Sequence, residues 1–436
     1  MMQNIPRSIL LAGRHVSSRA ASSSSSATTC GRSMSTSSSP WTNFEMAPLD
    51  PIVGLNETFQ KDDYPQKVIV GVGAYRDDVG KPYVLPCVRE AEQILMDAKG
   101  DMEYAGIAGE PKFVDLALKF VYGEDSKPIQ ENRVQGVQSL SGTGGLRVYG
   151  ELMRKHGHKH IYVPNPTWGN HIPIFQNSGL EVRKYRYYDS ESSDLDFDNM
   201  MKDIKNMPEG SIILLHACAH NPTGMDPTLE QWKEMSETVK KQGLVPFFDC
   251  AYQGFASGDP IKDAASVRMF VEDGHLISMV QSFSKNFGLY GLRLGALSVV
   301  GADEDEAKRV VSQMKTVIRP MYSNPPRHGA QIVSTILSDE RMTQDFLDQC
   351  RGMADRINLM RTELHDELEK AGSTKNWDHI TKQIGMFAYS GLTKDQVVEM
   401  RDKHHVYCTL DGRISMAGVT THNVEYIANA IHDVSK

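Results

Sequence analysis

The feature that most constrains the fold is the alternation of short apolar runs with longer amphipathic stretches along most of the chain. The nearly continuous apolar character of these runs predicts strands that are buried on both faces of a mainly parallel sheet. Helical patterns between the strands complete a three-layer α/β domain. The candidate strands lie at residues 136–140, 161–163, 212–215, 244–248, 276–280 and 296–300.

The helical patterns have recognisable ends. Asp226 is a good N-cap for one of them, and Gly243 is a good C-terminal stop for the same helix. Pro320 is expected to end another. A further pattern is longer than most globular helices, so it is a candidate bridge between two domains. The expected helices span residues 143–155, 227–241, 303–318 and 340–370.

Composition limits the classes of partner. The chain has 436 residues, which suggests two packed domains, and its formal net charge is −8. A mildly acidic chain is a poor candidate for binding nucleic acid or an anionic membrane. No apolar run is long enough to span a bilayer. None of the six cysteines forms a C-x-x-C pair, so most should be small core residues rather than metal ligands or disulfides.

The N-terminal segment differs from the rest of the chain. Residues 1–40 contain four arginines, a serine run at 22–26 and no acidic residue. This composition is typical of an organellar transit peptide, and no continuous apolar core follows the charges as a secretory signal would require. We therefore expect residues 1–40 to be disordered and cleaved after directing the chain to the mitochondrial matrix. A plastid address and a tail without any address are the alternatives.

Polar and reactive side chains gather directly after three of the candidate strands. They occupy residues 216–221 after one strand, Asp249 and Tyr252 after another, and residues 282–285 after a third. Open α/β sheets bind their ligands at the carboxyl ends of the strands. The sequence therefore predicts a functional site at this edge of the sheet.

Lys285 is the candidate nucleophile of that site. A lysine that is desolvated after a buried strand loses its proton more easily and can form a Schiff base, although a lone lysine here would more often lie on a surface turn. A Schiff base on pyridoxal phosphate (PLP) needs an aspartate that keeps the pyridine nitrogen protonated. Asp249 suits this role because a carboxylate at the end of an apolar run is costly to bury unpaired, with a helix N-cap as the alternative. The phenol of Tyr252 could bond the cofactor O3′ or simply pack with a satisfied hydroxyl.

Two further features suit anionic groups. Residues 141–145 read Ser-Gly-Thr-Gly-Gly between a strand and a helix, where backbone N–H groups and hydroxyls form an anion site or only a structural turn. Arg293, Arg319 and Arg413 lie near glycine, proline or aromatic residues. The planar guanidinium groups of two such arginines would bind the two carboxylates of a dicarboxylate. The alternative for each arginine is a surface salt bridge.

Two histidine groups raise the question of a metal. His216 and His220 are four residues apart, and His156, His158 and His160 are clustered. Neither group has an H-E-x-x-H pattern or an acidic partner nearby in the sequence, so we expect no metal site.

Together these motifs identify a family. From residue 41 to the C-terminus the chain resembles the aspartate aminotransferases, which are class I PLP-dependent enzymes. The resemblance implies a type I fold with a large, mainly parallel PLP-binding domain over residues 82–350. It also implies a small α+β domain built from residues 41–81 and 351–436, and a homodimer with shared active sites. The matching motifs, in the same order and spacing, are residues 71–77, 141–145, 166–171, 216–224, 248–255, 281–295, 319–326 and 411–418.

The resemblance also assigns site residues. Lys285 would carry PLP and act as the base for the proton shift, while Asp249 would pair with the pyridinium and be supported by His171. On the cofactor ring, Tyr252 and Asn221 would contact O3′, and Trp168 would stack on the ring face. The cofactor phosphate would be held by Ser141, Gly142, Thr143, Ser282 and Arg293, together with Tyr104 from the other subunit. Arg413 would bind the substrate α-carboxylate, Arg319 of the neighbouring subunit would bind the distal carboxylate, and Gly73 would line the substrate pocket.

The implied activity is the ping-pong transfer of the amino group of L-aspartate to 2-oxoglutarate through a PLP Schiff base on Lys285, giving oxaloacetate and L-glutamate. An aromatic or broad-range aminotransferase of the same fold stays open as an alternative. A non-catalytic scaffold would not need Lys285, Asp249 and Arg413 together. A nicotinamide-dependent dehydrogenase would need a dinucleotide fingerprint, which the sequence lacks.

Overall fold

The computed structural model describes residues 39–47 and 53–436. The chain divides into two compact units, Met1–Pro48 and Leu49–Lys436. In the first unit, the described residues form an exposed turn in which the rings of Trp41 and Phe44 lie 5.5 Å apart. Apart from residues 39 and 40, the predicted targeting segment lies outside the described residues. All elements named below belong to the second unit.

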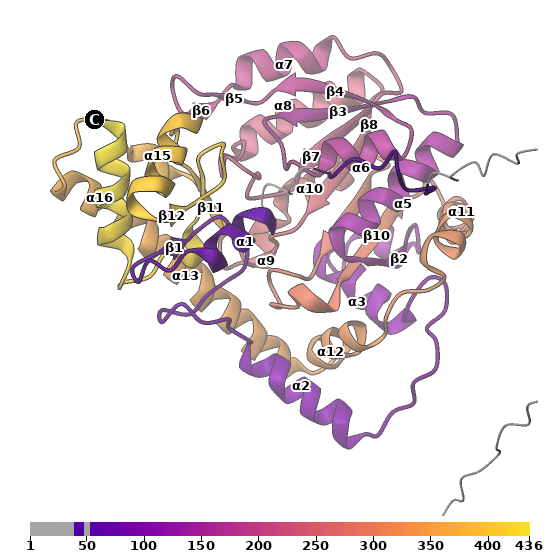
Figure 1. The fold of residues 1–436 in the computed structure, drawn as a ribbon. Helices are drawn as coiled ribbons and strands as arrows, with labels where there is room; N and C mark the ends of the chain where they lie inside the picture. Colours follow the sequence, from indigo (N-terminus) through magenta and orange to yellow (C-terminus); the bar gives the residue numbers. More distant parts are fainter. Residues whose placement is uncertain (1–38, 48–52) are drawn as a thin grey trace, which may run out of the picture. The chain divides into compact units, whose positions relative to one another are not determined.

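A seven-stranded sheet lies at the centre of this unit, in the order β2-β10-β9-β8-β7-β3-β4 (Figure 1). All strands run parallel except β10, which is antiparallel to β2 and β9. The prediction of a mainly parallel sheet is therefore confirmed, with each predicted strand within two residues of its expected bounds. The strands are β2 (Val134–Leu140), β3 (His160–Asn165), β4 (Glu181–Arg186), β7 (Ile212–His216), β8 (Val245–Cys250), β9 (Ser278–Ser282) and β10 (Leu294–Val300).

Helices cover both faces of the sheet, as the three-layer prediction requires. The alternation along β7 shows this, because Ile212 and Leu214 pack in one buried cluster while Ile213 and Leu215 pack in another. The first cluster joins the sheet to α5 (Ser141–Lys155), α6 (His171–Asn177) and α11 (Glu304–Tyr322). The second joins it to α3 (Pro111–Tyr122), α7 (Phe197–Lys205), α8 (Leu229–Lys241) and α10 (Ala265–Glu272).

One predicted helix cap is wrong. Helix α8 begins after Thr228, whose hydroxyl accepts from the backbone N–H of Gln231 in a capping box. The carboxylate of Asp226 instead accepts from the backbone N–H groups of Ala219 and His220, so it holds the preceding loop. The predicted stop at Gly243 is confirmed, since this glycine has a φ of +61° directly after the helix.

The predicted end of a helix before Pro320 is also wrong. Helix α11 continues through this proline to Tyr322. Pro320 lies in the last turn, where its missing N–H removes only one backbone hydrogen bond. Met321 and Tyr322 beyond it pack against the buried cluster on this face of the sheet, and that packing outweighs the local preference of proline.

Helix α13 (Glu340–Lys370) has the predicted bounds. It contacts α2 (Pro86–Asp97) and α12 (His328–Leu337), and also α14 (Asp378–Lys382) and α16 (Val424–Ser435). Short strands near the C-terminus pair as β11 (Phe387–Tyr389) with β13 (Arg413–Ser415), and as β1 (Val68–Ile69) with β12 (Val406–Tyr407). The remaining elements are α1 (Val53–Lys61), α4 (Lys127–Gln130), β5 (Tyr188–Asp189), β6 (Asp194–Leu195), α9 (Pro260–Asp263), η1 (Tyr290–Leu292), α15 (Lys394–His404) and η2 (Met416–Gly418).

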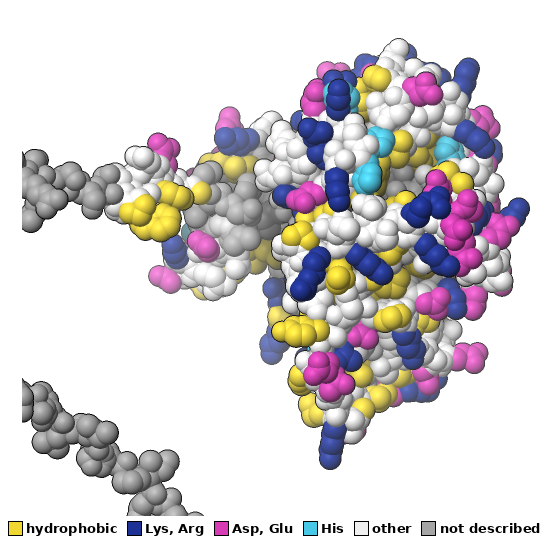
Figure 2. All heavy atoms as spheres, turned by 90° about the vertical axis from the view of Figure 1, so that its right-hand side faces the viewer, with side chains coloured by type: hydrophobic (Ala, Val, Ile, Leu, Met, Phe, Trp, Pro, Cys, Tyr) yellow, Lys and Arg dark blue, Asp and Glu magenta, His cyan; other side chains and the backbone are white. Residues whose placement is uncertain are grey.

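The cysteines agree with the expectation from composition, and one face of the molecule shows how its charges are distributed. On the face that carries α5 and α11, charged side chains of both signs are spread among apolar ones (Figure 2). The five cysteines within the described residues are free and buried. A search of the described helices finds none with the length and apolar character needed to cross a membrane.

Candidate active site

A cavity of about 260 Å³ lies at the carboxyl ends of β7, β8 and β9, where the sequence predicted a ligand site. The start of α5 and residues near the C-terminus complete its wall. Of the predicted site residues, only His171, Tyr104 and Arg319 do not line it. The lining consists of Gly73, Ser141, Gly142, Thr143, Leu146, Trp168, His216, Cys218, Asn221, Asp249, Ala251, Tyr252, Ser282, Ser284, Lys285, Tyr290, Arg293, Phe387 and Arg413.

Lys285 follows β9 and its amine lies within the cavity wall. Nζ donates a hydrogen bond to the carbonyl oxygen of Gly73 and lies 5.1 Å from the centre of the Tyr290 ring. Burial lowers the pKa of this amine to about 7, and the positive charges of Arg413 and Arg293 act in the same direction. Near neutral pH a large share of the amine is therefore uncharged, which is the form that attacks a carbonyl carbon.

Asp249 reaches the cavity from β8, and a histidine holds it from behind. Nε2 of His171 lies 3.0 Å from Oδ2 of Asp249, and Nδ1 of the same ring lies 2.8 Å from the hydroxyl of Thr167. His171 has no exposed surface, so this chain of contacts is shielded from water. The arrangement fixes one carboxylate oxygen and keeps the side chain in place at the cavity wall.

Tyr252, Asn221 and Arg413 form a second connected group. The Asn221 amide donates to the Tyr252 hydroxyl over 3.3 Å, and Nη1 of Arg413 donates to Oδ1 of Asn221 over 3.1 Å. Burial raises the pKa of the Tyr252 phenol, although the charge of Arg413 opposes this shift. Nη2 of Arg413 donates to the carbonyl of Gly71, while its Nε is buried with no partner among the described residues.

Hydroxyl groups and a helix start form another part of the cavity wall. The Ser141 hydroxyl lies 3.0 Å from that of Ser282 and 2.8 Å from that of Ser284. Ser141 is the first residue of α5, so the unpaired N–H groups and positive dipole end of a 15-residue helix face this group. Arg293 adds a full positive charge from a left-handed conformation with φ of +52°. These features together favour a phosphate-sized anion.

Trp168 and His216 complete the wall. The Trp168 ring lies 5.3 Å from the ring of His171 and perpendicular to it. His216 lies 3.4 Å from the Thr167 hydroxyl. Burial lowers the pKa of His216 to about 3, so this ring is neutral at physiological pH and adds no charge beside Asp249.

Besides His171, two predicted residues do not line the cavity of the single chain. Tyr104 is 88% exposed. Arg319 is on the exposed side of α11, where its guanidinium donates to the hydroxyl of Ser323. Both were assigned to the active site of a neighbouring subunit, so their exposure in one chain is compatible with that assignment but does not test it.

Several lining residues had not been predicted. Ser284 and Tyr290 lie inside a recognised motif, so their position next to Lys285 was an available signal. His216 had been considered only as a possible metal ligand. Phe387 gave no signal, because an apolar residue in a short strand candidate is indistinguishable by pattern from a core residue.

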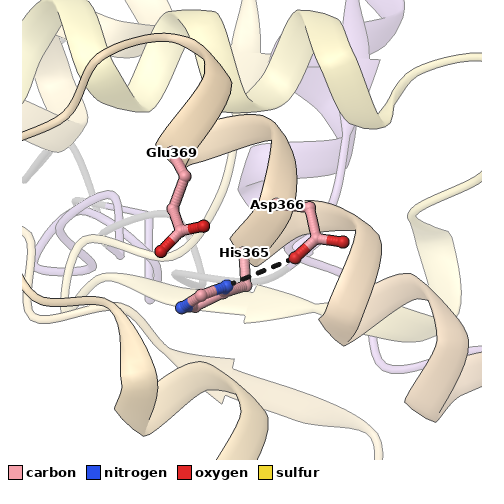
Figure 3. A group of neighbouring side chains, drawn as sticks. All are labelled: His365, Asp366 and Glu369. Atoms are coloured by element: carbon pink, nitrogen blue, oxygen red, sulfur yellow. Dashed lines mark hydrogen bonds and ion pairs between the residues drawn. The ribbon is translucent and has the colours of Figure 1, made fainter.

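One metal-like cluster occurs within the described residues, away from the cavity. His365, Asp366 and Glu369 on α13 place their ligand atoms within 4.8 Å of one another (Figure 3). Nε2 of His365 also lies 3.3 Å from Oδ1 of Asp378. Both carboxylates are exposed, and exposed acidic groups commonly lie this close without an ion.

The family-model comparison agrees with this geometry. Residues 65–431 match the model described as aminotransferase class I and II. The match covers both the strand-end residues of the central sheet and the C-terminal segment that carries Arg413.

Individual relatives and a solved structure are also similar. The chain is 54% identical to a mitochondrial aspartate aminotransferase of Arabidopsis thaliana, covering 92% of this chain and 93% of that one. It is 53% identical to a cytoplasmic aspartate aminotransferase of Oryza sativa, covering 91% and 98%. A crystal structure of an aromatic-amino-acid aminotransferase from Burkholderia pseudomallei, covalently bound to PLP, superposes with a TM-score of 0.89 at 41% identity, covering 92% and 100%.

Proposed function

The chain belongs to the class I and II aminotransferase family, and from that premise we propose how its own residues transfer the amino group of L-aspartate to 2-oxoglutarate. The cofactor is PLP, and the products are oxaloacetate and L-glutamate. The observation that carries the assignment of roles is the meeting of Lys285, Asp249 and Arg413 around one cavity.

The residues present fit PLP. The cofactor has a phosphate at one end, a pyridine nitrogen at the other and an aldehyde between them. The cavity wall carries hydroxyls, a helix start and Arg293, which suit the phosphate. It also carries the carboxylate of Asp249, which suits the ring nitrogen, and the amine of Lys285, which suits the aldehyde. When bound, PLP supplies a ring that accepts the electrons released from the substrate Cα–H bond.

Ser141, Gly142, Thr143, Ser282 and Arg293 would hold the phosphate through charge-assisted hydrogen bonds. These contacts fix the cofactor at the end remote from the chemistry, so their binding energy can be used to orient the reacting atoms. Tyr104 of a second subunit would add a phenol to the same phosphate.

Asp249 would accept a hydrogen bond from the protonated ring nitrogen and so keep that proton in place. His171 and Thr167 orient the carboxylate from behind. Tyr252 and Asn221 would contact the ring oxygen O3′, and Trp168 would cover one ring face. The buried, hydrogen-bonded setting makes each of these contacts stronger than it would be in water.

Lys285 would perform the proton transfer once the substrate amine has displaced it. Its freed Nζ would take the proton from the substrate Cα and would later give up a proton to complete the shift. A pKa near 7 suits both steps, because an amine of this strength both accepts and releases a proton near neutral pH. The second half of the ping-pong cycle reverses these steps with 2-oxoglutarate.

Arg413 would bind the substrate α-carboxylate. Its buried Nε already lacks a partner among the described residues, which leaves a charged donor available at the cavity. Arg319 of a second subunit would bind the distal carboxylate, and Gly73 lines the substrate space through its backbone. Two guanidinium groups at opposite ends would select dicarboxylates of aspartate and glutamate length.

The full assembly we propose is a homodimer, because the described residues that line the cavity offer no candidate for the distal carboxylate other than those already assigned. We also propose a large domain over residues 82–350, a small domain from 41–81 and 351–436, and a matrix location directed by residues 1–40.

The similarity to a mitochondrial relative supports the matrix location. Since a cytoplasmic relative is similarly identical, the location rests mainly on the composition of residues 1–40. Fusing residues 1–40 to a reporter and testing protease protection inside isolated mitochondria checks the address, with isolated plastids as the comparison.

The experiment that tests the function uses the absorption spectrum of protein lacking residues 1–40. L-Aspartate without any keto acid should convert the visible band of lysine-bound PLP to the spectrum of the aminated cofactor, and 2-oxoglutarate should restore the band. An enzyme whose band responds to tyrosine but not to aspartate would be an aromatic aminotransferase, which the similarity to the Burkholderia pseudomallei structure makes the second candidate. A chain that takes up no PLP would be a scaffold.

A further inference from the structure

A buried arginine outside the assigned site makes an unusual set of contacts. Arg361, on α13, is 2% exposed and has the largest volume among the fully buried side chains that the structure describes. Its hydrogen bonds go to main-chain carbonyls rather than to a carboxylate. Its Nε has no partner within the described residues. A buried charge with this little compensation is costly, so its contacts invite a functional explanation.

The acceptors of Arg361 all lie in one short segment. Nη1 donates to the carbonyl of Ile380 over 3.1 Å, while Nη2 donates to the carbonyls of Gly385 and Phe387 over 2.7 and 2.6 Å. The planar guanidinium therefore binds carbonyl groups from α14 to the start of β11 at the same time. A lysine ammonium is a single point of charge on a flexible stem and could not reproduce this spread of contacts.

The other side of the same segment forms part of the active-site wall. The Phe387 ring lies 4.0 Å from the guanidinium carbon of Arg413. A Cβ added to Gly73 would come within 2.9 Å of Cζ of Phe387, so the ring has little room to move in that direction. The guanidinium thus lies over the Phe387 ring at the place where the substrate carboxylate is expected.

The segment is also fitted closely against the loop that carries Asn221. Gly385 has a φ of +83°, and a Cβ added there would lie 2.4 Å from Cβ of Ala219. The N–H of Ile384 donates to the carbonyl of Gly224 over 2.8 Å. Arg361 on one side and this loop on the other therefore confine the segment between them.

Building on the proposed role of Arg413 as the α-carboxylate ligand, we propose that Arg361 is a positioning residue for substrate binding. By holding the carbonyls of Ile380, Gly385 and Phe387, it fixes the Phe387 ring, and that ring fixes the Arg413 guanidinium. The role is indirect, because Arg361 does not line the cavity. Its effect should therefore fall on the affinity for the carboxylate rather than on the proton transfer at Lys285.

The test is a double-mutant cycle on the PLP-loaded enzyme with Arg361→Lys, Phe387→Leu and the combination. Arg361→Lys should raise the KM for both aspartate and 2-oxoglutarate about tenfold, while kcat changes less than about twofold. Phe387→Leu should do the same, and the double variant should be no worse than the poorer single variant. Arg351→Lys, the same change at an exposed position of the same helix, should leave both constants unchanged.

The outcomes separate the possibilities. Additive effects on KM would show that Arg361 does not act through Phe387 and would overturn the proposal, as would an unchanged KM. Arg361→Gln serves as a second variant, and loss of folding by both substitutions would assign Arg361 to stability alone. If instead the unaltered enzyme failed to convert aspartate, or Arg413→Leu left its KM unchanged, the proposed site roles would be wrong independently of Arg361.

Discussion

The imidazole of His171 lies 3.0 Å from the carboxylate of Asp249, and no part of His171 is exposed to solvent. The aspartate comes from the end of β8 and the histidine from the first turn of α6, so two elements of the sheet domain fix one carboxylate. This carboxylate and the hydroxyl groups of Ser141 and Ser282 line the same cavity. In the proposed site, the pair would therefore help to orient PLP.

Asp249→Asn should lower kcat by at least about a hundredfold, because an amide does not stabilise the protonated ring nitrogen. Asp249→Glu keeps the negative charge, so its kcat should fall less than that of Asp249→Asn. Single-turnover spectra with aspartate measure the step directly. His171→Gln is the matched variant, since it removes the support without removing the charge, and it should cost roughly tenfold. Equal losses for Asn and Glu would mean that the carboxylate charge is not what Asp249 contributes.

Lys285→Ala should abolish turnover while the protein still binds PLP without a covalent bond. The phosphate contacts proposed for the hydroxyl group around Ser141 do not involve Lys285, so they should still hold the cofactor. Absorbance after gel filtration measures retained PLP, and coupled oxaloacetate detection measures turnover. Turnover within tenfold of the unaltered enzyme would remove Lys285 from the mechanism.

The rate at which PLP reacts with the cofactor-free protein should rise with pH around a midpoint near 7. Burial lowers the pKa of Lys285 to about 7 from its ordinary value of 10.5. Below pH 7 the amine is protonated and cannot attack the aldehyde, and above it the neutral amine predominates. Stopped-flow absorbance gives the profile. Arg413→Leu should shift the midpoint upward because it removes a positive charge that disfavours protonation.

Asp226 should make the fold less stable as pH rises from 4 to 6.5, relative to an Asp226→Asn variant. Burial raises its pKa to about 6 from 3.8. Since the folded pKa lies above the unfolded one, the favourable contribution is complete below pH 3.8 and is lost as pH rises through 6. The difference should amount to at most about 3 kcal/mol. Urea unfolding of PLP-loaded protein at several pH values measures it, with the exposed Asp348→Asn as the control. If the free energies of unfolding of the unaltered protein and the Asp226→Asn variant differed by a constant amount across this pH range, the prediction would be contradicted.

The central sheet could be predicted from sequence because its strands are apolar on both sides. Residues 212–215 have no polar position, and the pattern left little choice of structure. Edge strand β4 was not predicted, because most of its residues are charged and its pattern resembles a surface loop. The two helix errors arose where other contacts outweighed the helix signal. Asp226 binds backbone N–H groups of the preceding loop, and the residues after Pro320 pack against a buried cluster.

The candidate site was predictable where chemistry and motif coincided, as at Lys285 and Asp249. It was not predictable at Phe387 or Arg361, because their roles depend on which segments lie opposite one another in the fold. The pairing of β11 with β13 places Tyr389 opposite Arg413 and brings Phe387 beside it. No spacing along the chain records that relationship.

Arg319 provides a test of whether active sites are shared between subunits. The guanidinium is exposed in the single chain and does not line its cavity. Arg319→Asp should weaken the use of aspartate far more than that of tyrosine, because it removes one carboxylate ligand and adds a repulsive charge. Equal loss on both substrates would mean that Arg319 does not select dicarboxylates.

Mixed dimers separate the two possible locations of Arg319. A dimer of one Lys285→Ala subunit with one Arg319→Asp subunit contains a site with its own Lys285 and the other subunit's Arg319. If Arg319 serves the neighbouring site, this hybrid should recover about half the activity of the unaltered dimer at low aspartate, although each parent dimer is nearly inactive. Differently tagged subunits, refolded together and purified through both tags, give the hybrid. If Arg319 served its own subunit, the hybrid would stay as inactive as the Arg319→Asp parent, since no site would then combine both intact residues.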